Sequence, residues 1–101
     1  MAKERMIEQV IGLTYDTNAA KLEKAIKILS DITLSHPNVS RNDIKFTEYG
    51  AYSLNINMRY WIKDPNLYRD TLNDINMKIK KAFEKEKIEM AFPTQTIQLV
   101  K

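Results

Sequence analysis

The chain has 101 residues, of which 44% are hydrophobic and 29% charged, so it is long enough for one compact core and too short for two ordinary domains. It has no cysteine, which excludes a disulfide framework, a Cys-based zinc site and a thiol nucleophile, and which suits a reducing compartment such as the cytosol. Its 16 basic and 13 acidic residues are interspersed, which is typical of a solvated surface rather than of a nucleic-acid groove. We therefore expect a single domain over residues 1–101.

The chain begins with a predicted strand over residues 5–13. This segment is rich in β-branched and apolar side chains, which favour extended backbone. Side chains alternate along a strand, so Met6 and Val10 point to one side while Ile7 and Ile11 point to the other. Because apolar residues lie on both sides, we expect both faces of this strand to be covered.

A helix is predicted next, over residues 18–35, because apolar residues recur there at a spacing of three and four. Residues 16–18 supply several possible N-cap oxygens, and Pro37 ends the helix because proline disfavours helical backbone in the residue before it. His36 is the only histidine of the chain. We expect it to cap the helix or to interact with the helix dipole rather than to act in catalysis.

Two strands and a second helix follow. Residues 44–49 and 52–62 are predicted strands joined by a tight connection at residues 50–51, and the later strand alternates strictly between apolar and polar side chains. We expect its apolar face to pack under the helices; the residues of this face are Leu54, Ile56, Met58, Tyr60 and Ile62. The second helix is predicted over residues 64–86, with an aspartate as its N-cap and a proline in its first turn.

The charged side chains of the second helix have an ordinary structural explanation. Acidic residues precede lysines along it, which suits the helix dipole and predicts an ion pair between Asp74 and Lys78. Asp70 and Asp74 share a helix face, but a hard-cation site needs more converging oxygens, so we expect no metal. The lysine run over residues 78–87 is interrupted by acidic residues and predicts a solvated face. The sequence offers no catalytic triad and no phosphate-cradling glycine loop, so we expect no enzyme and no cofactor.

The order of the predicted elements, β-α-β-β-α-β, is that of the ferredoxin-like split βαβ motif. This α+β fold places two helices on one face of an antiparallel sheet. The last predicted strand is a short tail over residues 94–101, which includes Ile97 and Leu99. Two pairings remain open for this tail: it pairs with a strand of its own sheet and closes that sheet, or it pairs with the same strand of other copies. The fold hosts many functions, so the function has to be argued from the sites.

Arg59 and Trp61 lie on the polar side of the strand over residues 52–62 and are candidate binding residues. The strand does not fit the RNP1 pattern of RNA-binding ferredoxin-like domains. One hypothesis is that the two side chains stack on a base or hold a small molecule. The favoured hypothesis is that they pack on a neighbouring protein surface, since Trp and Arg often anchor interfaces.

Three segments, IGLTYDTNAAKLEKAIKIL, FTEYGAYSLNINMRYWIKDPN and IKKAFEKEKIEMAFPTQTIQL, resemble in order and spacing the carboxy-terminal cytoplasmic domain of the small-conductance mechanosensitive channel (MscS) family. The resemblance covers nearly the whole chain. Its most specific parts are residues 15–17, 59–61 and 92–93. The chain departs from the family pattern at Lys87, where a glycine is usual.

The resemblance implies a part of a larger membrane protein, on the cytoplasmic side of a bacterial or archaeal membrane. In the family, seven such subunits form a hollow cage beneath the pore, and their tails assemble into a small parallel barrel. The implied role in osmotic pressure relief is structural, oligomerising and solute-filtering, with no catalytic residue. We expect the isolated fragment to be a monomer or weak oligomer without a nucleic-acid partner. The alternative is a free-standing ferredoxin-like domain that binds a small molecule or RNA.

Overall fold

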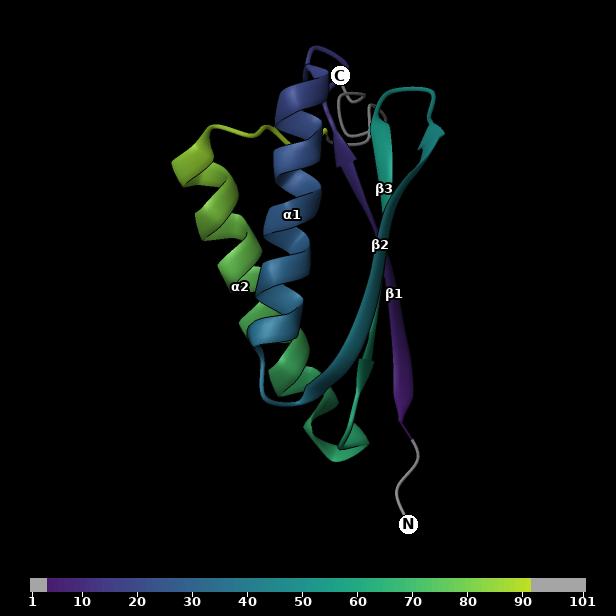
Figure 1. The fold of residues 1–101 in the computed structure, drawn as a ribbon, viewed down its shortest axis with the longest axis vertical. Helices are drawn as coiled ribbons and strands as arrows, with labels where there is room; N and C mark the ends of the chain where they lie inside the picture. Colours follow the sequence, from purple (N-terminus) through teal and green to yellow (C-terminus); the bar gives the residue numbers. More distant parts are fainter. Residues whose placement is uncertain (1–3, 92–101) are drawn as a thin grey trace, which may run out of the picture.

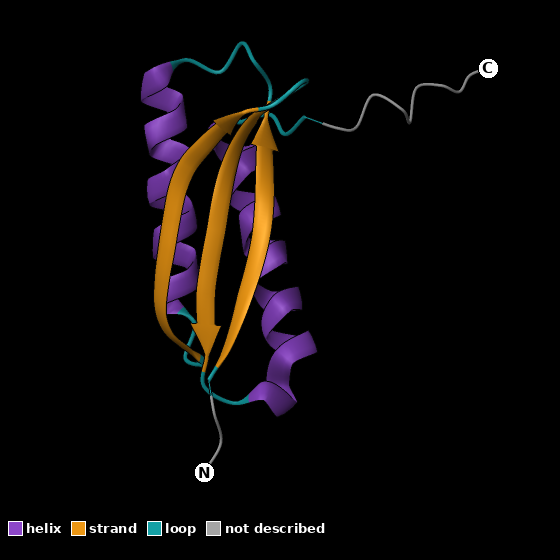
Figure 2. Ribbon diagram, turned by 90° about the vertical axis from the view of Figure 1, so that its right-hand side faces the viewer, coloured by secondary structure: helices purple, strands orange, loops and turns teal. Residues whose placement is uncertain are grey.

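Residues 4–91 are described by a computed structural model, in which an antiparallel sheet is covered on one face by two helices (Figures 1 and 2). These elements follow the predicted order β-α-β-β-α, so the α+β fold class is confirmed. Their bounds are β1 Arg5–Leu13, α1 Ala19–Ser35, β2 Val39–Tyr49, β3 Leu54–Ile62 and α2 Tyr68–Glu86, with a short 3₁₀ helix, η1 Pro65–Leu67, before α2. The predicted tail strand over residues 94–101 lies outside the described residues.

The central strand of the sheet is β3, because the strand order is β1-β3-β2 and both pairs are antiparallel. β1 pairs with β3 over its whole length, from Arg5 opposite Ile62 to Leu13 opposite Leu54. The register between β2 and β3 is interrupted by two irregularities. This order is the one that the ferredoxin-like motif prescribes for its first three strands. On its other edge, β1 makes an isolated antiparallel bridge between Leu13 and Met90.

Local side-chain bonds fix the starts of the helices. Asn18 Oδ1 accepts the backbone N–H of Lys21 at 2.8 Å and is the N-cap of α1, in agreement with the predicted capping segment. The sequence predicts that Asp64 opens the second helix directly, and this is wrong in detail. Asp64 Oδ1 accepts the N–H of Asn66 at 3.0 Å and closes the 3₁₀ turn, so α2 begins only at Tyr68.

β2 begins at Val39, well before the predicted start at residue 44. Asn42 explains why the sequence pattern did not mark this early start. Its Nδ2 donates to Thr33 Oγ1 at 2.8 Å and lies 3.1 Å from the carbonyl oxygen of Ser30, and both of these residues are on α1. An amide on the helix side of the strand interrupts the apolar alternation that marks a strand in the sequence. β3 begins at Leu54 rather than at residue 52.

The core lies between the sheet and the helices. The apolar face of β3 is buried as predicted, with Leu54 7% exposed and Ile56, Met58, Tyr60 and Ile62 each 0% exposed. The helices contribute buried residues of their apolar stripes, namely Ala25, Leu29, Ile75, Ile79 and Phe83. Neither helix of the described part of the chain is long and apolar enough to span a membrane.

Two buried polar atoms lie on adjacent strands of this core. The Tyr60 hydroxyl on β3 and Gln9 Oε1 on β1 have no hydrogen-bond partner among residues 4–91. Burial raises the pKa of Tyr60 to about 12, and the neighbouring Tyr68 acts in the same direction. A buried hydroxyl without a partner lowers the free energy of unfolding, because folding removes its hydrogen bonds to water and does not replace them.

The face of the sheet opposite the helices is open in the described chain (Figure 2). Met6 is 43% exposed and Val10 is 61% exposed, so the prediction that both faces of the first strand are covered is wrong for residues 4–91. Both helices pack on the same side, which leaves the second apolar row of β1 uncovered.

Candidate subunit interface

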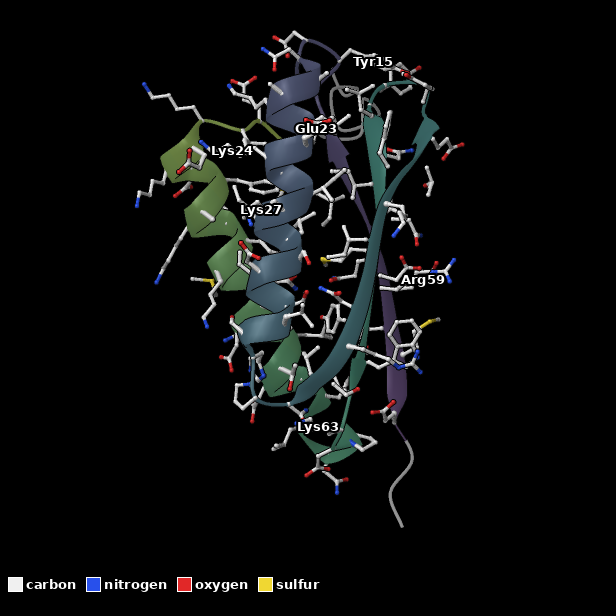
Figure 3. The ribbon with its side chains drawn as sticks, in the orientation of Figure 1. Tyr15, Glu23, Lys24, Lys27, Arg59 and Lys63 are labelled. Atoms are coloured by element: carbon white, nitrogen blue, oxygen red, sulfur yellow. The ribbon has the colours of Figure 1, made fainter. Side chains whose placement is uncertain are left out.

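The open face of the sheet, called here the outer sheet face, carries the two candidate residues Arg59 and Trp61. The strand registers arrange its side chains in three rows that cross β1, β3 and β2. These rows are Met6, Trp61 and Arg41; Glu8, Arg59 and Asp43; and Val10, Asn57 and Lys45. Figure 3 shows Arg59 projecting from the sheet on the side away from the helices.

Trp61 is half-buried beneath a side chain of its own domain. The Arg41 guanidinium carbon lies 4.0 Å from the centroid of the Trp61 ring, which is a cation–π contact. The exposed Met6 side chain is the cross-strand neighbour of Trp61 on β1. The sequence predicts Trp61 as a contact residue but does not reveal Arg41, because only the register of β2 on β3 brings the two together.

Arg59 lies in a network of opposite charge on the outer sheet face. Its Nε is 3.3 Å from Glu8 Oε2 and donates to Asn57 Oδ1 at 3.1 Å. Asn57 Nδ2 in turn donates to Glu8 Oε2 at 2.9 Å. The row is therefore an ordered set of alternating charges and amides rather than a patch of one sign.

Asp43 and Lys45 extend this balance onto β2. The hydrogen bond from Lys45 Nζ to Asp43 Oδ1, 2.9 Å long, is the largest cause that lowers the pKa of the Asp43 carboxyl, and the charges of Lys45 and Arg59 act in the same direction. At the edge of the same face, Arg41 Nε lies 3.8 Å from Glu4 Oε1. Such exposed pairs contribute little to stability, but they give the outer sheet face a mixed charge pattern rather than a patch of one sign.

The other polar candidates have partners within the described chain. His36 ends α1, in line with its predicted capping role, while its ring bonds to Asn38 and Asp74 rather than to the last helix carbonyls. The predicted pair of Asp74 with Lys78 is wrong, because the Asp74 carboxylate lies against His36 Nε2 at 3.0 Å. Within residues 4–91, no three acidic or histidine side chains gather closely enough to hold a metal ion.

The charges of α2 are partly neutralised, as the sequence predicts for a solvated face. Lys80 Nζ lies 3.4 Å from Glu84 Oε2 one turn further on. Lys24 of α1 binds Glu86 across the helix pair, and this hydrogen bond and charge lower the pKa of the Glu86 carboxyl. The two remaining candidates, Ile97 and Leu99, lie outside the described residues.

The comparisons with known proteins agree on one family. Residues 7–90 match the family described as "Mechanosensitive ion channel MscS, C-terminal". The chain is 42% identical over 100 residues to the Large-conductance mechanosensitive channel MscMJLR of Methanocaldococcus jannaschii, covering 92% of the chain and 28% of that protein. It is 41% identical over 100 residues to the Small-conductance mechanosensitive channel MscMJ of the same organism, covering 96% of the chain and 29% of that protein.

The fold gives the same answer. The crystal structure of Helicobacter pylori MscS in its closed state matches with a TM-score of 0.73 and 25% identity, over 99% of this chain and 40% of that chain. The protein is thus an α+β domain of the mechanosensitive-channel class. The chain belongs to the MscS family and corresponds to its carboxy-terminal domain. It spans less than a third of the length of the two archaeal channels.

Proposed function

We propose that this chain is the cytoplasmic cage domain of a mechanosensitive ion channel that relieves osmotic pressure. The observation that carries the proposal is the match to two named mechanosensitive channels over more than nine-tenths of the chain. In this role the domain is structural, holds subunits together and filters the solutes that reach the pore. It acts on the cytoplasmic side of a bacterial or archaeal membrane, in a homo-heptamer, and it is not an enzyme.

A chimera tests the proposal. The corresponding carboxy-terminal region of MscMJ is replaced by this chain, and currents under membrane tension are recorded by patch clamp. We expect the chimera to open under tension and to remain assembled on native gels, while MscMJ shortened by the same region loses assembly or current. A chimera that reaches the membrane and behaves like the shortened channel would contradict the proposal.

Solute filtering has its own readout in the same cells. After an osmotic downshift, cells with the chimera are expected to release small ions and to retain larger solutes, because these must pass the openings of the cage. Cells with the shortened channel are expected to lose solutes of both sizes. Equal release of large solutes by the two channels would remove filtering from the proposed role while leaving assembly in place.

Within this function, we propose that Arg59 and Trp61 form part of a contact between subunits or domains, together with Ile97 and Leu99. Support comes from the fixed charge pattern of the outer sheet face and from the exposed Met6 beside Trp61. Trp61→Ala and Arg59→Glu in the chimera are expected to weaken assembly on native gels. Lys27→Ala is the matched control, because Lys27 lies on the exposed face of α1 on the helix side (Figure 3).

The alternative function, binding of RNA or a small molecule by Arg59 and Trp61, has less support. Arg41 already lies over the Trp61 ring, and Glu8 and Asn57 already bind Arg59, so a ligand must displace these contacts first. We expect no binding of a single-stranded oligonucleotide at physiological salt beyond weak electrostatic association. Sub-micromolar binding that is abolished by Trp61→Ala would favour the alternative.

A further inference from the structure

Residues 36–38, called here the α1–β2 turn, are held by hydrogen bonds that converge on Asn38. Asn38 is buried, and its side-chain amide donates to Thr71 Oγ1 on α2 at 2.9 Å and accepts the backbone N–H of Asp64 at 2.9 Å. Its backbone carbonyl accepts the N–H of Lys63 at 2.8 Å. The turn therefore joins α1, the start of α2 and the segment after β3, which Figure 1 shows at the same end of the domain.

The backbone N–H of Asn38 has an acceptor that can change its charge. It donates to His36 Nδ1 at 3.0 Å, while Nε2 of the same ring lies 3.0 Å from Asp74 Oδ2. The side chain of His36 is 11% exposed, so the ring is largely withdrawn from water. A ring nitrogen accepts a hydrogen bond only while it carries no proton, so both contacts together require the neutral ring with its proton on Nε2.

The charges of α2 near the ring act in opposite directions. The Asp74 carboxylate would attract a charged ring, but its side chain is 53% exposed, and ion pairs of exposed groups gain little. Lys78 and Lys81 line the same surface hollow as His36 and Asp74, and their positive charges would repel a charged ring. The surroundings on α2 thus compensate a second proton on the ring only in part.

The charged side chains of the other neighbouring elements are engaged elsewhere. On α1, Asp31 Oδ2 lies 3.6 Å from Lys27 Nζ. In the segment after β3, Asp64 Oδ1 closes the 3₁₀ turn described above. On β2, Arg41 and Asp43 lie on the outer sheet face, away from the helices. Asp74 is therefore the carboxylate that contacts the His36 ring within the described chain.

We infer that the α1–β2 turn is a pH-sensitive device, in which a proton on His36 Nδ1 releases the buried N–H of Asn38. The acceptor of that N–H becomes a second donor, and a buried donor without an acceptor costs more than an exposed ion pair returns. The turn that connects α1, β2 and α2 is thus weakened as the solution becomes acidic. The inference stands on these hydrogen bonds alone and does not depend on the proposed function.

Urea denaturation of the 101-residue chain at about pH 7.5 and pH 5.5 tests the inference. His36→Asn is the matched control, because asparagine can place an acceptor oxygen near the position of Nδ1 and does not take up a proton. We expect the unfolding equilibrium constant to rise about fivefold more in the wild-type chain than in His36→Asn. The chain has no other histidine, so the difference isolates this ring. Equal rises would overturn the inference.

Asp74→Asn separates the two opposing effects. It keeps an oxygen that accepts from His36 Nε2 but removes the negative charge that favours a charged ring. We expect the rise of the unfolding equilibrium constant to grow to about tenfold over the same pH range. If the wild-type chain instead becomes more stable toward the lower pH, and Asp74→Asn loses that gain, the ion pair prevails and the inference is overturned.

The amide proton of Asn38 reports on the turn in the folded chain. We expect its NMR signal to move upfield together with the titration of the His36 ring, because its acceptor is lost. The control is the amide of Lys21, which donates to Asn18 Oδ1 at 2.8 Å at the other end of α1 and has an acceptor that does not titrate. A signal of Asn38 that stays still or moves downfield while the ring takes up its proton would overturn the inference.

Discussion

His36 Nε2 lies 3.0 Å from Asp74 Oδ2, so the residue that ends α1 is tied to the second turn of α2. The other ring nitrogen, Nδ1, accepts the backbone N–H of Asn38 at 3.0 Å. A neutral ring that donates from Nε2 satisfies both bonds at once. The side chain of His36 thereby joins two helices and the loop into β2.

This link predicts that His36→Ala lowers the free energy of unfolding by about 1–2 kcal/mol, because a backbone donor and a carboxylate each lose a partner. Asp74→Ala should lower it less, and the two effects should not add, because they remove the same bond. Urea denaturation measures all of the variants. Lys78→Ala is the control and should change stability by less than about 0.5 kcal/mol; a loss equal to that of His36→Ala would contradict the assignment.

Tyr60→Phe is expected to stabilise the domain by about 1 kcal/mol, because it removes a buried hydroxyl that has no partner among the described residues. The gain should depend on pH. The pKa of Tyr60 rises from the ordinary value of 10.0 to about 12 on folding, so the proton is held more tightly in the folded state. The stability that this proton contributes is complete below pH 10 and is lost as the pH rises through 12.

The advantage of Tyr60→Phe should therefore widen between pH 10 and pH 12, as measured by thermal melting. Tyr52→Phe, at an exposed position, is the control and should show no such widening. If Tyr60→Phe is destabilising at neutral pH, the hydroxyl has a partner after all.

Lys87→Gly should raise the free energy of unfolding by about 1 kcal/mol. Lys87 ends α2 with φ 59° and ψ 39°, a left-handed conformation that glycine adopts without the steric cost of a Cβ. The bond from the Ile88 N–H to the Phe83 carbonyl, 2.9 Å long, holds this turn in place. Lys85→Gly, inside the helix, is the control and should lower the free energy of unfolding by about 1 kcal/mol. Chemical denaturation measures both variants, and a lower free energy of unfolding for Lys87→Gly as well would refute the expectation.

Ile56→Asp should prevent stable folding, because a charge in the middle of β3 would be fully buried without a partner. The expected cost is on the order of 4 kcal/mol or more, a large part of the stability of a domain of this size. Thr47→Asp on the exposed part of β2 is the control and should be nearly neutral. A retained thermal transition in Ile56→Asp would show that the core has been assigned to the wrong face.

The parts of the fold that follow from local patterns could be predicted from the sequence. The strict alternation in β3 identified the buried face of Leu54, Ile56, Met58 and Tyr60, and the Asn18 cap and Pro37 marked the two ends of α1. The parts that depend on distant pairs could not. The start of β2 was hidden because Asn42 satisfies its amide on α1, and no pattern within the strand signals that partner.

The candidate site shows the same division. Arg59 and Trp61 alternate with the apolar residues of β3, and this alternation predicts their place on the outer sheet face. Their partners Glu8 and Arg41 come from strands whose register is set by packing over the whole sheet. The exposure of Met6 depends on both helices packing on the same side, which the apolar pattern of β1 alone does not reveal.

The strand order has a consequence for how the domain is made. β1 and β2 each pair with β3, and β3 follows both of them in the chain. During synthesis no strand pair of this sheet can form before residues 54–62 have emerged. The β2–β3 hairpin then closes locally and fast, whereas β1 must find β3 across the whole of α1 and β2. Until that late step β1 has no neighbour in the sheet, so a nascent chain that stalls before Leu54 exposes Met6 and Val10 together with the apolar row that later enters the core.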